Sequence, residues 1–188
     1  MTAFLVSFLV VALAEMGDKT QLVAFSLASR YRRPWVVMYG ILIATLANHA
    51  LAASVGAWVG TRVAERALEW LLGLGFVAFG IWSLAPGRAP APTAPRAWGP
   101  LISTAVVFFV AEMGDKTQLA TAALGARFAS PVAVTAGTTI GMLASDGLAV
   151  FAGTRLAGGQ LVTVARRVAA GLFFAFGLVA ILRAAGIV

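Results

Sequence analysis

Six apolar runs, each close to the length that crosses a lipid bilayer, occupy most of this 188-residue sequence. A transmembrane helix needs about 20 mostly apolar residues. The runs cover residues 3–28, 34–60, 67–85, 101–125, 131–154 and 167–187. Only 11% of the residues are charged, against roughly 25% in a soluble domain. The chain therefore lacks the polar surface of a water-soluble enzyme, and we predict an all-α integral membrane protein with six transmembrane helices.

The composition excludes several kinds of site. There is no cysteine, which rules out disulfides, thiol nucleophiles and iron–sulfur clusters, and the single His49 rules out a multi-histidine metal centre. The net charge of +7 does not indicate a nucleic-acid partner, because most basic residues are arginines in or beside the short gaps between apolar runs. Arginines in those places set membrane topology and contact anionic lipid headgroups. We expect membrane lipid as a partner and no bound cofactor.

The sequence consists of two similar halves. Residues 15–21 read Glu-Met-Gly-Asp-Lys-Thr-Gln and recur identically as residues 112–118, an offset of 97 positions. The same offset pairs Pro34 with Pro131 and Gly80 with Gly177. We predict a first three-helix repeat over residues 1–85, a Pro/Ala-rich linker over 86–100 and a second three-helix repeat over 101–188.

An odd number of spans in each repeat makes the second repeat enter the membrane from the opposite side. Such inverted repeats are a recurring transporter architecture, with the substrate site near the bilayer midplane. Eight arginines fall on the side of the connections between spans 1–2, 3–4 and 5–6, and four on the other side. The excess of arginine predicts that the first side faces the cytoplasm and that both termini lie outside.

The acidic residues are concentrated inside the predicted spans. Glu65 and Glu69 interleave with Arg62 and Arg66 near a helix start, which predicts an interfacial cluster at that helix end. The other five of the seven acids lie within apolar runs: Glu15, Asp18, Glu112, Asp115 and Asp146. A charge at mid-bilayer costs about 3 kcal/mol on insertion scales, so acids placed there indicate a functional site.

The repeated motif brings polar groups to one face if it lies on a continuous helix. Glu15 and Asp18 are then three residues apart, and Lys19 is placed to pair with Glu15. Gly17 permits close helix approach or a local break, which the hydroxyl of Thr20 could help to satisfy. Gln21 extends the polar strip, and the second motif supplies the equivalent groups: Glu112, Asp115, Lys116, Thr117 and Gln118.

An all-oxygen cluster suits a hard divalent cation such as Ca²⁺, Mg²⁺ or Mn²⁺. The four motif carboxylates and two lysines sum to a charge of −2, which one such ion neutralises. Asn48 and Asp146 are further candidate metal ligands, while Ser145 and His49 are candidate supporting or proton-carrying groups. The structural alternative is that Glu15–Lys19 and Glu112–Lys116 are ion pairs that only hold helices together.

The two Glu-x-Gly-Asp-Lys-Thr motifs, one in each half, resemble those of the Gdt-type family of small cation transporters. That family includes Golgi Ca²⁺/Mn²⁺–proton exchangers and bacterial manganese exporters, and lies near the LysE-like exporters. The resemblance covers essentially the whole chain and implies metal-binding roles for Glu15, Asp18, Glu112 and Asp115. The linker is Pro/Ala-rich and carries Arg88 and Arg96, where eukaryotic members often have an acidic linker, and this compact form is typical of bacteria.

These observations predict a secondary transporter that exports Mn²⁺, or Ca²⁺, in exchange for protons across a bacterial inner membrane. Three alternatives remain open: an exporter of amino acids or other small organic ions, an intramembrane metal-dependent enzyme, and a passive cation channel. The sequence contains no His-Glu-x-x-His or Gly-x-Ser-x-Gly element that would favour an enzyme. We therefore expect no enzymatic activity. The sequence does not rank Mn²⁺ against Ca²⁺ or give an oligomeric state.

Overall fold

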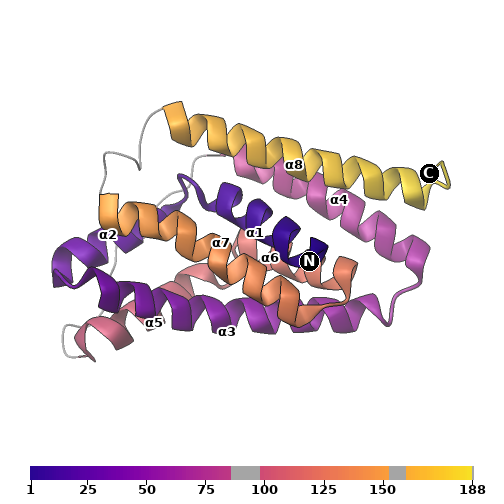
Figure 1. The fold of residues 1–188 in the computed structure, drawn as a ribbon. Coiled ribbons are helices and arrows are strands. Elements are labelled where there is room, and N and C mark those ends of the chain that lie inside the picture. Colours follow the sequence, from indigo (N-terminus) through magenta and orange to yellow (C-terminus); the bar gives the residue numbers. More distant parts are fainter. Residues whose placement is uncertain (86–97, 153–159, 188) are drawn as a thin grey trace.

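The computed structural model describes residues 1–85, 98–152 and 160–187, and this part of the chain contains eight helices and no strand. The predicted all-helical class is confirmed. The helices, drawn in Figure 1, are α1 (Thr2–Glu15), α2 (Lys19–Tyr31), α3 (Pro34–Gly60), α4 (Glu65–Leu84), α5 (Gly99–Glu112), α6 (Lys116–Phe128), α7 (Pro131–Ala152) and α8 (Gln160–Ala184). Most of the predicted 86–100 linker lies outside the described residues.

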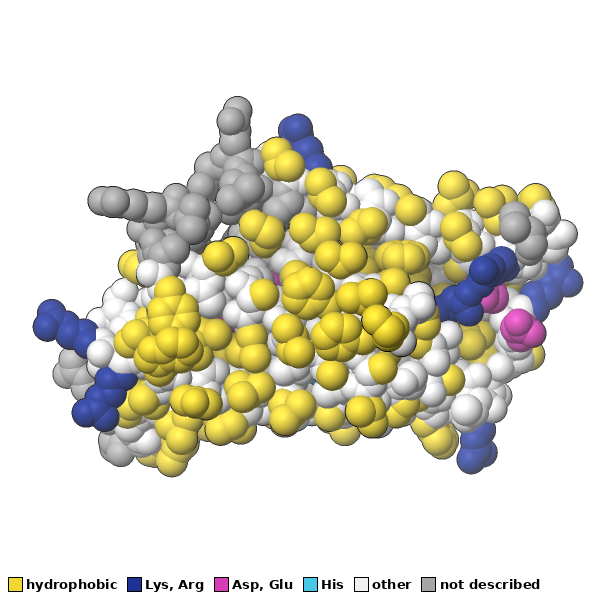
Figure 2. Space-filling model, in the orientation of Figure 1, with side chains coloured by type: hydrophobic (Ala, Val, Ile, Leu, Met, Phe, Trp, Pro, Cys, Tyr) yellow, Lys and Arg dark blue, Asp and Glu magenta, His cyan; other side chains and the backbone are white. Residues whose placement is uncertain are grey.

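Within the described residues, four helices are long and apolar enough to cross a membrane: α3, α4, residues Pro131–Phe151 of α7 and residues Arg167–Ala184 of α8. Large apolar side chains such as Trp35, Leu51 and Trp58 face outward along α3. Figure 2 shows hydrophobic side chains over the middle of the molecule and Lys and Arg toward its two ends. This distribution is that of a protein whose solvent is a lipid bilayer.

The first and fourth predicted spans are not continuous helices, so the assumption that each motif lies on one helix is wrong. Residues 3–28 are divided between α1 and α2, and residues 101–125 between α5 and α6. The breaks fall within the motifs, at Gly17 (φ +76°) and Gly114 (φ +72°). An L-residue with a side chain is disfavoured at such angles, which explains glycine at both positions.

The two halves repeat one another in backbone geometry. Helices α1 and α5 both have 14 residues, and α2 and α6 both have 13. In the part of the chain that the structure describes, two non-glycine residues have positive φ, Arg32 and Ala129. They are related by the 97-residue offset, and each directly follows one of the 13-residue helices. The sequence repeat is thus also a repeat of helix lengths and of the breaks between helices.

The halves are interleaved rather than side by side. Helix α1 packs along α7 of the other half, α3 packs against α5, α6 and α7, and α4 pairs with α8. The α4–α8 pair lies along one side of the remaining helices, at the top of Figure 1. Gly56 of α3 approaches the backbone of Ala122 in α6, and Gly137 of α7 approaches the carbonyl of Phe4 in α1. A Cβ atom would clash at either position, so both glycines permit close packing between helices of the two halves.

Two apolar clusters lie on opposite sides of the motif breaks. The first includes Val10 of α1, Leu124 of α6, and Phe76 and Phe173 of the α4–α8 pair. The second is built from α2, α3, α5 and α7, with members such as Leu27, Ile41 and Phe108. Since α1 and α6 meet the motifs from one end of the molecule, and α2 and α5 from the other, the motifs lie between the two clusters.

Candidate cation site

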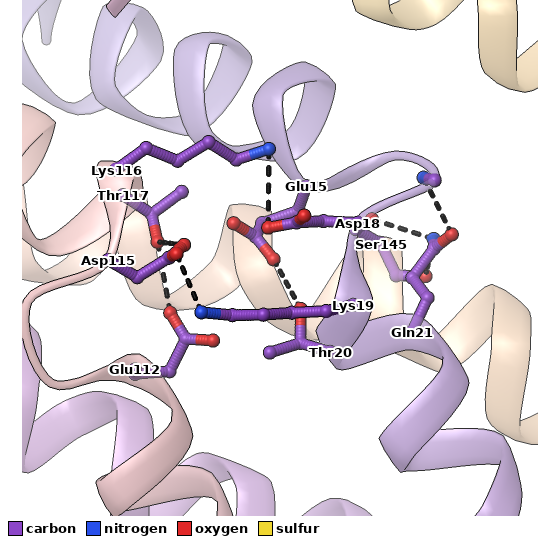
Figure 3. A network of polar contacts seen from close by, with 11 residues as sticks. Glu15, Asp18, Lys19, Thr20, Gln21, Glu112, Asp115, Lys116, Thr117 and Ser145 are labelled. Atoms are coloured by element: carbon purple, nitrogen blue, oxygen red, sulfur yellow. Dashed lines mark hydrogen bonds and ion pairs between the residues drawn. The ribbon is translucent and has the colours of Figure 1, made fainter. Parts of the chain in front are cut away.

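The two helix breaks bring the motif residues together in the interior. Glu15 is the last residue of α1, Asp18 directly precedes α2, and Glu112 and Asp115 take the same places between α5 and α6. Figure 3 shows these four carboxylates close together, with Lys19 reaching toward Asp115 and Lys116 toward Asp18. Glu15 and Glu112 are fully buried, and Asp18 and Asp115 nearly so.

Each break is held by the glutamine that ends the motif. The N–H of Gly17 donates to Oε1 of Gln21 at 2.8 Å, and the N–H of Gly114 donates to Oε1 of Gln118 at 2.7 Å. These bonds satisfy backbone donors that a broken helix leaves without partners in the membrane interior. The two glutamines therefore fix the shape of the turns that carry the acids.

The same glutamines join the two halves. Nε2 of Gln21 donates to the carbonyl oxygen of Ser145 at 2.8 Å and to its hydroxyl at 2.9 Å, and Nε2 of Gln118 lies 3.3 Å from Oδ1 of Asn48. Asn48 also donates to the carbonyl of Phe109 at 3.0 Å. In this arrangement Asn48 and Ser145 support the motif turns.

The lysines do not form the predicted pairs within their own motifs. Nζ of Lys19 lies 2.7 Å from Oδ1 of Asp115, and Nζ of Lys116 lies 3.2 Å from Oδ2 of Asp18. The structural alternative, in which Glu15 pairs with Lys19 and Glu112 with Lys116, is wrong, because the helix breaks remove the spacing on which those pairs depend. Each lysine instead pairs with the aspartate of the other repeat.

The two motif threonines orient the glutamates. The hydroxyl of Thr20 donates to Oε2 of Glu15 at 2.6 Å, and that of Thr117 donates to Oε2 of Glu112 at 3.0 Å. One carboxylate oxygen from each of Glu15, Glu112 and Asp115 lies within 4.8 Å of the others. A hard cation such as Ca²⁺ holds its oxygen ligands at about 2.3–2.6 Å, so this group of oxygens is compact enough to surround one ion.

Asp146 of α7 adds a fifth acid at the site. It is fully buried, and its charge interacts with those of Glu15 and Asp18. His49 occupies the repeat-related position on α3 and is also fully buried. Neither ring nitrogen of His49 has a hydrogen-bond partner among the described residues, and its carbonyl faces the hydroxyl of Thr135 at 3.5 Å.

Several buried carboxylate oxygens have no donor in the described part of the chain. Around the motifs they include Oε1 of Glu15, Oε1 of Glu112 and both side-chain oxygens of Asp146. A buried anionic oxygen without a partner is costly, and a bound cation or a proton removes the cost. The cluster is therefore chemically suited to take up one or the other.

Glu69 has ion-pair partners that the sequence does not predict. The sequence predicts that Glu65 and Glu69 form an interfacial cluster with Arg62 and Arg66 at the helix end. The structure adds partners from other helices, because Oε1 of Glu69 faces Arg127 of α6 at 3.6 Å and Arg183 of α8 at 3.9 Å. Arg66 instead donates to the carbonyl of Ala184, and Arg62 lies over the ring of Trp58. No local spacing indicates this arrangement, because its partners come from two distant helices.

Broken helices that meet at buried acids inside an apolar helical bundle define a membrane transport protein. Comparison with known families agrees: the model of the divalent cation/proton antiporter GDT1 matches residues 3–91 and 100–187. The chain therefore belongs to the GDT1 family of divalent cation/proton antiporters.

Two relatives extend this comparison. A protein of Vibrio cholerae serotype O1 named "Putative manganese exporter" is 41% identical over 179 residues, covering 95% of this chain and 90% of the relative. The "GDT1-like protein sll0615" of Synechocystis is 30% identical over 203 residues, covering 95% of this chain and 96% of the relative. No solved structure matches the chain significantly.

Proposed function

We propose that this protein exports a hard divalent cation from the cytoplasm in exchange for protons, with Mn²⁺ the favoured substrate and Ca²⁺ the second. The observation that carries the proposal is the set of buried carboxylate oxygens without donors on Glu15, Glu112 and Asp146. The family of the chain and the name of its Vibrio relative support the same reading.

The two lysine–aspartate pairs set the charge of the proposed site. Lys19 and Lys116 balance Asp115 and Asp18, which leaves Glu15 and Glu112 with a formal charge of −2 when both are ionised. One divalent cation neutralises that charge, and so do two protons. The metal requires ionised ligands, so metal binding and protonation exclude one another at the same oxygens. Asp146 adds another acceptor that can bind either species.

An exchange follows if the site faces the two sides of the membrane in turn. We propose six transmembrane segments, in which α1 with α2 and α5 with α6 each form one broken span. With three spans in each half, the repeats have opposite orientations in the membrane, and alternating access follows the pattern of other inverted-repeat transporters. We place both termini outside a bacterial inner membrane, so that protons enter as metal leaves.

The substrate class is tested in proteoliposomes containing the purified protein and a pH gradient. We expect saturable flux of Mn²⁺, slower flux of Ca²⁺ and no flux of lysine or other amino acids. Glu15→Gln and Glu112→Gln should each abolish metal flux. Glu65→Gln should retain it, because Glu65 is exposed and remote from the motifs. Amino-acid flux without divalent-cation flux would favour the organic-ion exporter and overturn the proposal.

A further inference from the structure

A second cluster of charged residues lies away from the motifs. It joins Glu69 of α4 to Arg127 of α6 and Arg183 of α8, so one buried carboxylate connects three helices. Oε2 of Glu69 is buried and has no hydrogen-bond partner among the described residues. We call Glu69, Arg127 and Arg183 the Glu69 cluster. It lies at the end of the molecule where α8 finishes and α3 connects to α4, toward the right in Figure 1.

The Glu69 cluster borders two cavities. The outer cavity, about 670 Å³, is lined by the cluster together with Glu65, Arg66 and residues 184–186. The inner cavity, about 270 Å³, is lined by the same three charged residues, by Thr2 at the start of α1, and by apolar side chains that include Val6, Phe76 and Leu124. The three charged side chains thus border both spaces.

An apolar layer separates the inner cavity from the motifs. Phe76 stacks on Phe173 with ring centroids 6.2 Å apart, and both belong to the apolar cluster that contains Val10 and Leu124. Val10 and Glu15 lie on the same helix, little more than one turn apart. From Glu15 toward this end, the order is therefore an apolar layer, the inner cavity, the Glu69 cluster and the outer cavity.

The other end of the molecule does not carry the same residues. At the 97-residue offset, Glu69 corresponds to Arg166 and Arg183 corresponds to Pro86, so the acid and one of its two partners have no equivalent in sequence. The packing differs as well. Helix α8 packs on α1 and α4 packs on α6, whereas in the described residues neither α4 on α5 nor α8 on α2 makes a comparable contact.

We propose that the Glu69 cluster is the outer part of a gate between the cation site and the face of the membrane at which the termini lie, with the apolar layer as its inner part. This inference rests on the proposed transport role of the motif carboxylates. The ion pairs hold α4 and α8 against α6, and their separation would join the inner cavity to the outer one. Distances of 3.6 and 3.9 Å and partly exposed arginines describe contacts that water can replace, as a gate requires.

The absence of cysteine from the natural chain makes the gate directly testable. A Leu124→Cys variant places a single thiol on the inner cavity, and its reaction with a membrane-impermeant maleimide is followed from the side of the termini. Glu69→Gln removes the ion pairs of the Glu69 cluster and should raise the labelling rate of the thiol at residue 124 at least fivefold. A thiol in an Ala185→Cys variant, which lies on the outer cavity, should react at the same rate with and without Glu69→Gln.

Glu65→Gln is the matched control, because it removes the same charge from the same helix at an exposed residue that lines only the outer cavity. It should leave labelling at residue 124 unchanged. Arg127→Gln and Arg183→Gln should each accelerate labelling, which keeps the test decisive if the Glu69 variant does not fold. Equal labelling rates in all folded variants would overturn the gate.

The labelling needs no metal, so the gate and the proposed transport function can be refuted independently of each other. Faster labelling in protein that moves no divalent cation would refute the transport role, while the Glu69 cluster would still control access to the inner cavity. Unchanged labelling in protein that exchanges Mn²⁺ for protons would remove only the gate. Faster labelling together with wild-type Mn²⁺–proton exchange supports both.

Discussion

Lys19 reaches from the first repeat to Asp115 of the second, and the 2.7 Å between Nζ and Oδ1 makes this the shortest ion pair in the described part of the chain. The repeat-related ion pair joins Lys116 of the second repeat to Asp18 of the first. The two repeats are therefore joined through their functional motifs as well as through apolar packing. Changes at either lysine should affect both the stability of the bundle and the charge of the site.

The two lysines should differ in their contribution to stability. The Lys116–Asp18 pair is about 5% exposed on both sides, whereas Lys19 is 22% exposed. Lys116→Met leaves a buried aspartate without a counter-charge, and we expect it to lower the free energy of unfolding in detergent by about 3 kcal/mol. Lys19→Met should cost less, because Lys19 is itself partly exposed and water can enter the space that it leaves beside Asp115.

A double variant separates the charge effect from lost packing. Asp18→Asn added to Lys116→Met removes the unpaired carboxylate and should recover part of the lost stability. If Lys116→Met unfolded with the stability of the wild type, the ion pair would contribute nothing, and the account of the joined repeats would be wrong on this point.

The threonine–glutamate bonds should matter for transport. Thr20→Val and Thr117→Val each remove a hydroxyl that donates to a buried glutamate, at 2.6 and 3.0 Å respectively. A hydrogen bond to a charged group contributes about 1.5–3 kcal/mol, so we expect Mn²⁺ flux to fall about tenfold or more. Thr45→Val is the matched control, because the buried Thr45 hydroxyl has no partner among the described residues. Equal flux in all three variants would contradict the orienting role of Thr20 and Thr117.

The glycines at the helix breaks should not tolerate alanine. Gly17→Ala and Gly114→Ala each place a Cβ atom at φ above +70°, and we expect a loss of about 1–2 kcal/mol in the free energy of unfolding from each. Gly75→Ala offers the contrast, since a Cβ atom there meets nothing within 4 Å and α4 is helical throughout. That variant should gain up to about 1 kcal/mol. Thermal unfolding in detergent measures all three, and a Gly17→Ala protein as stable as Gly75→Ala would show that the break does not require glycine.

Apolar run length was a good guide to the longer helices. The predicted ranges 34–60 and 67–85 agree closely with α3 and α4, because an uninterrupted apolar run bounded by proline, arginine or glycine has few alternatives in a membrane. Run length could not locate the two breaks. A glycine inside an apolar run is compatible with both a continuous and a broken helix, and the choice depends on partners such as Gln21 and Ser145.

The acids of the candidate site could be identified from the sequence, but their ion-pair partners could not. Five acids inside apolar runs indicated a polar site, and the structure brings Glu15, Glu112 and Asp115 within 4.8 Å of one another. The pairing of Lys19 with Asp115, like that of Glu69 with Arg127, joins residues far apart in the chain. Helical spacing describes neighbours on one helix and carries no information on such contacts, which depend on how separate helices pack.

The central claim is that one set of buried carboxylates carries either a divalent cation or protons. It is tested by measuring Mn²⁺ flux and internal pH together in proteoliposomes with the membrane potential clamped. We expect Mn²⁺ flux in one direction to be accompanied by proton movement in the other, to depend on the pH gradient, and to disappear in Glu15→Gln and Glu112→Gln proteins. Mn²⁺ flux without proton movement, and independent of the pH gradient, would contradict the account and leave a uniporter or channel.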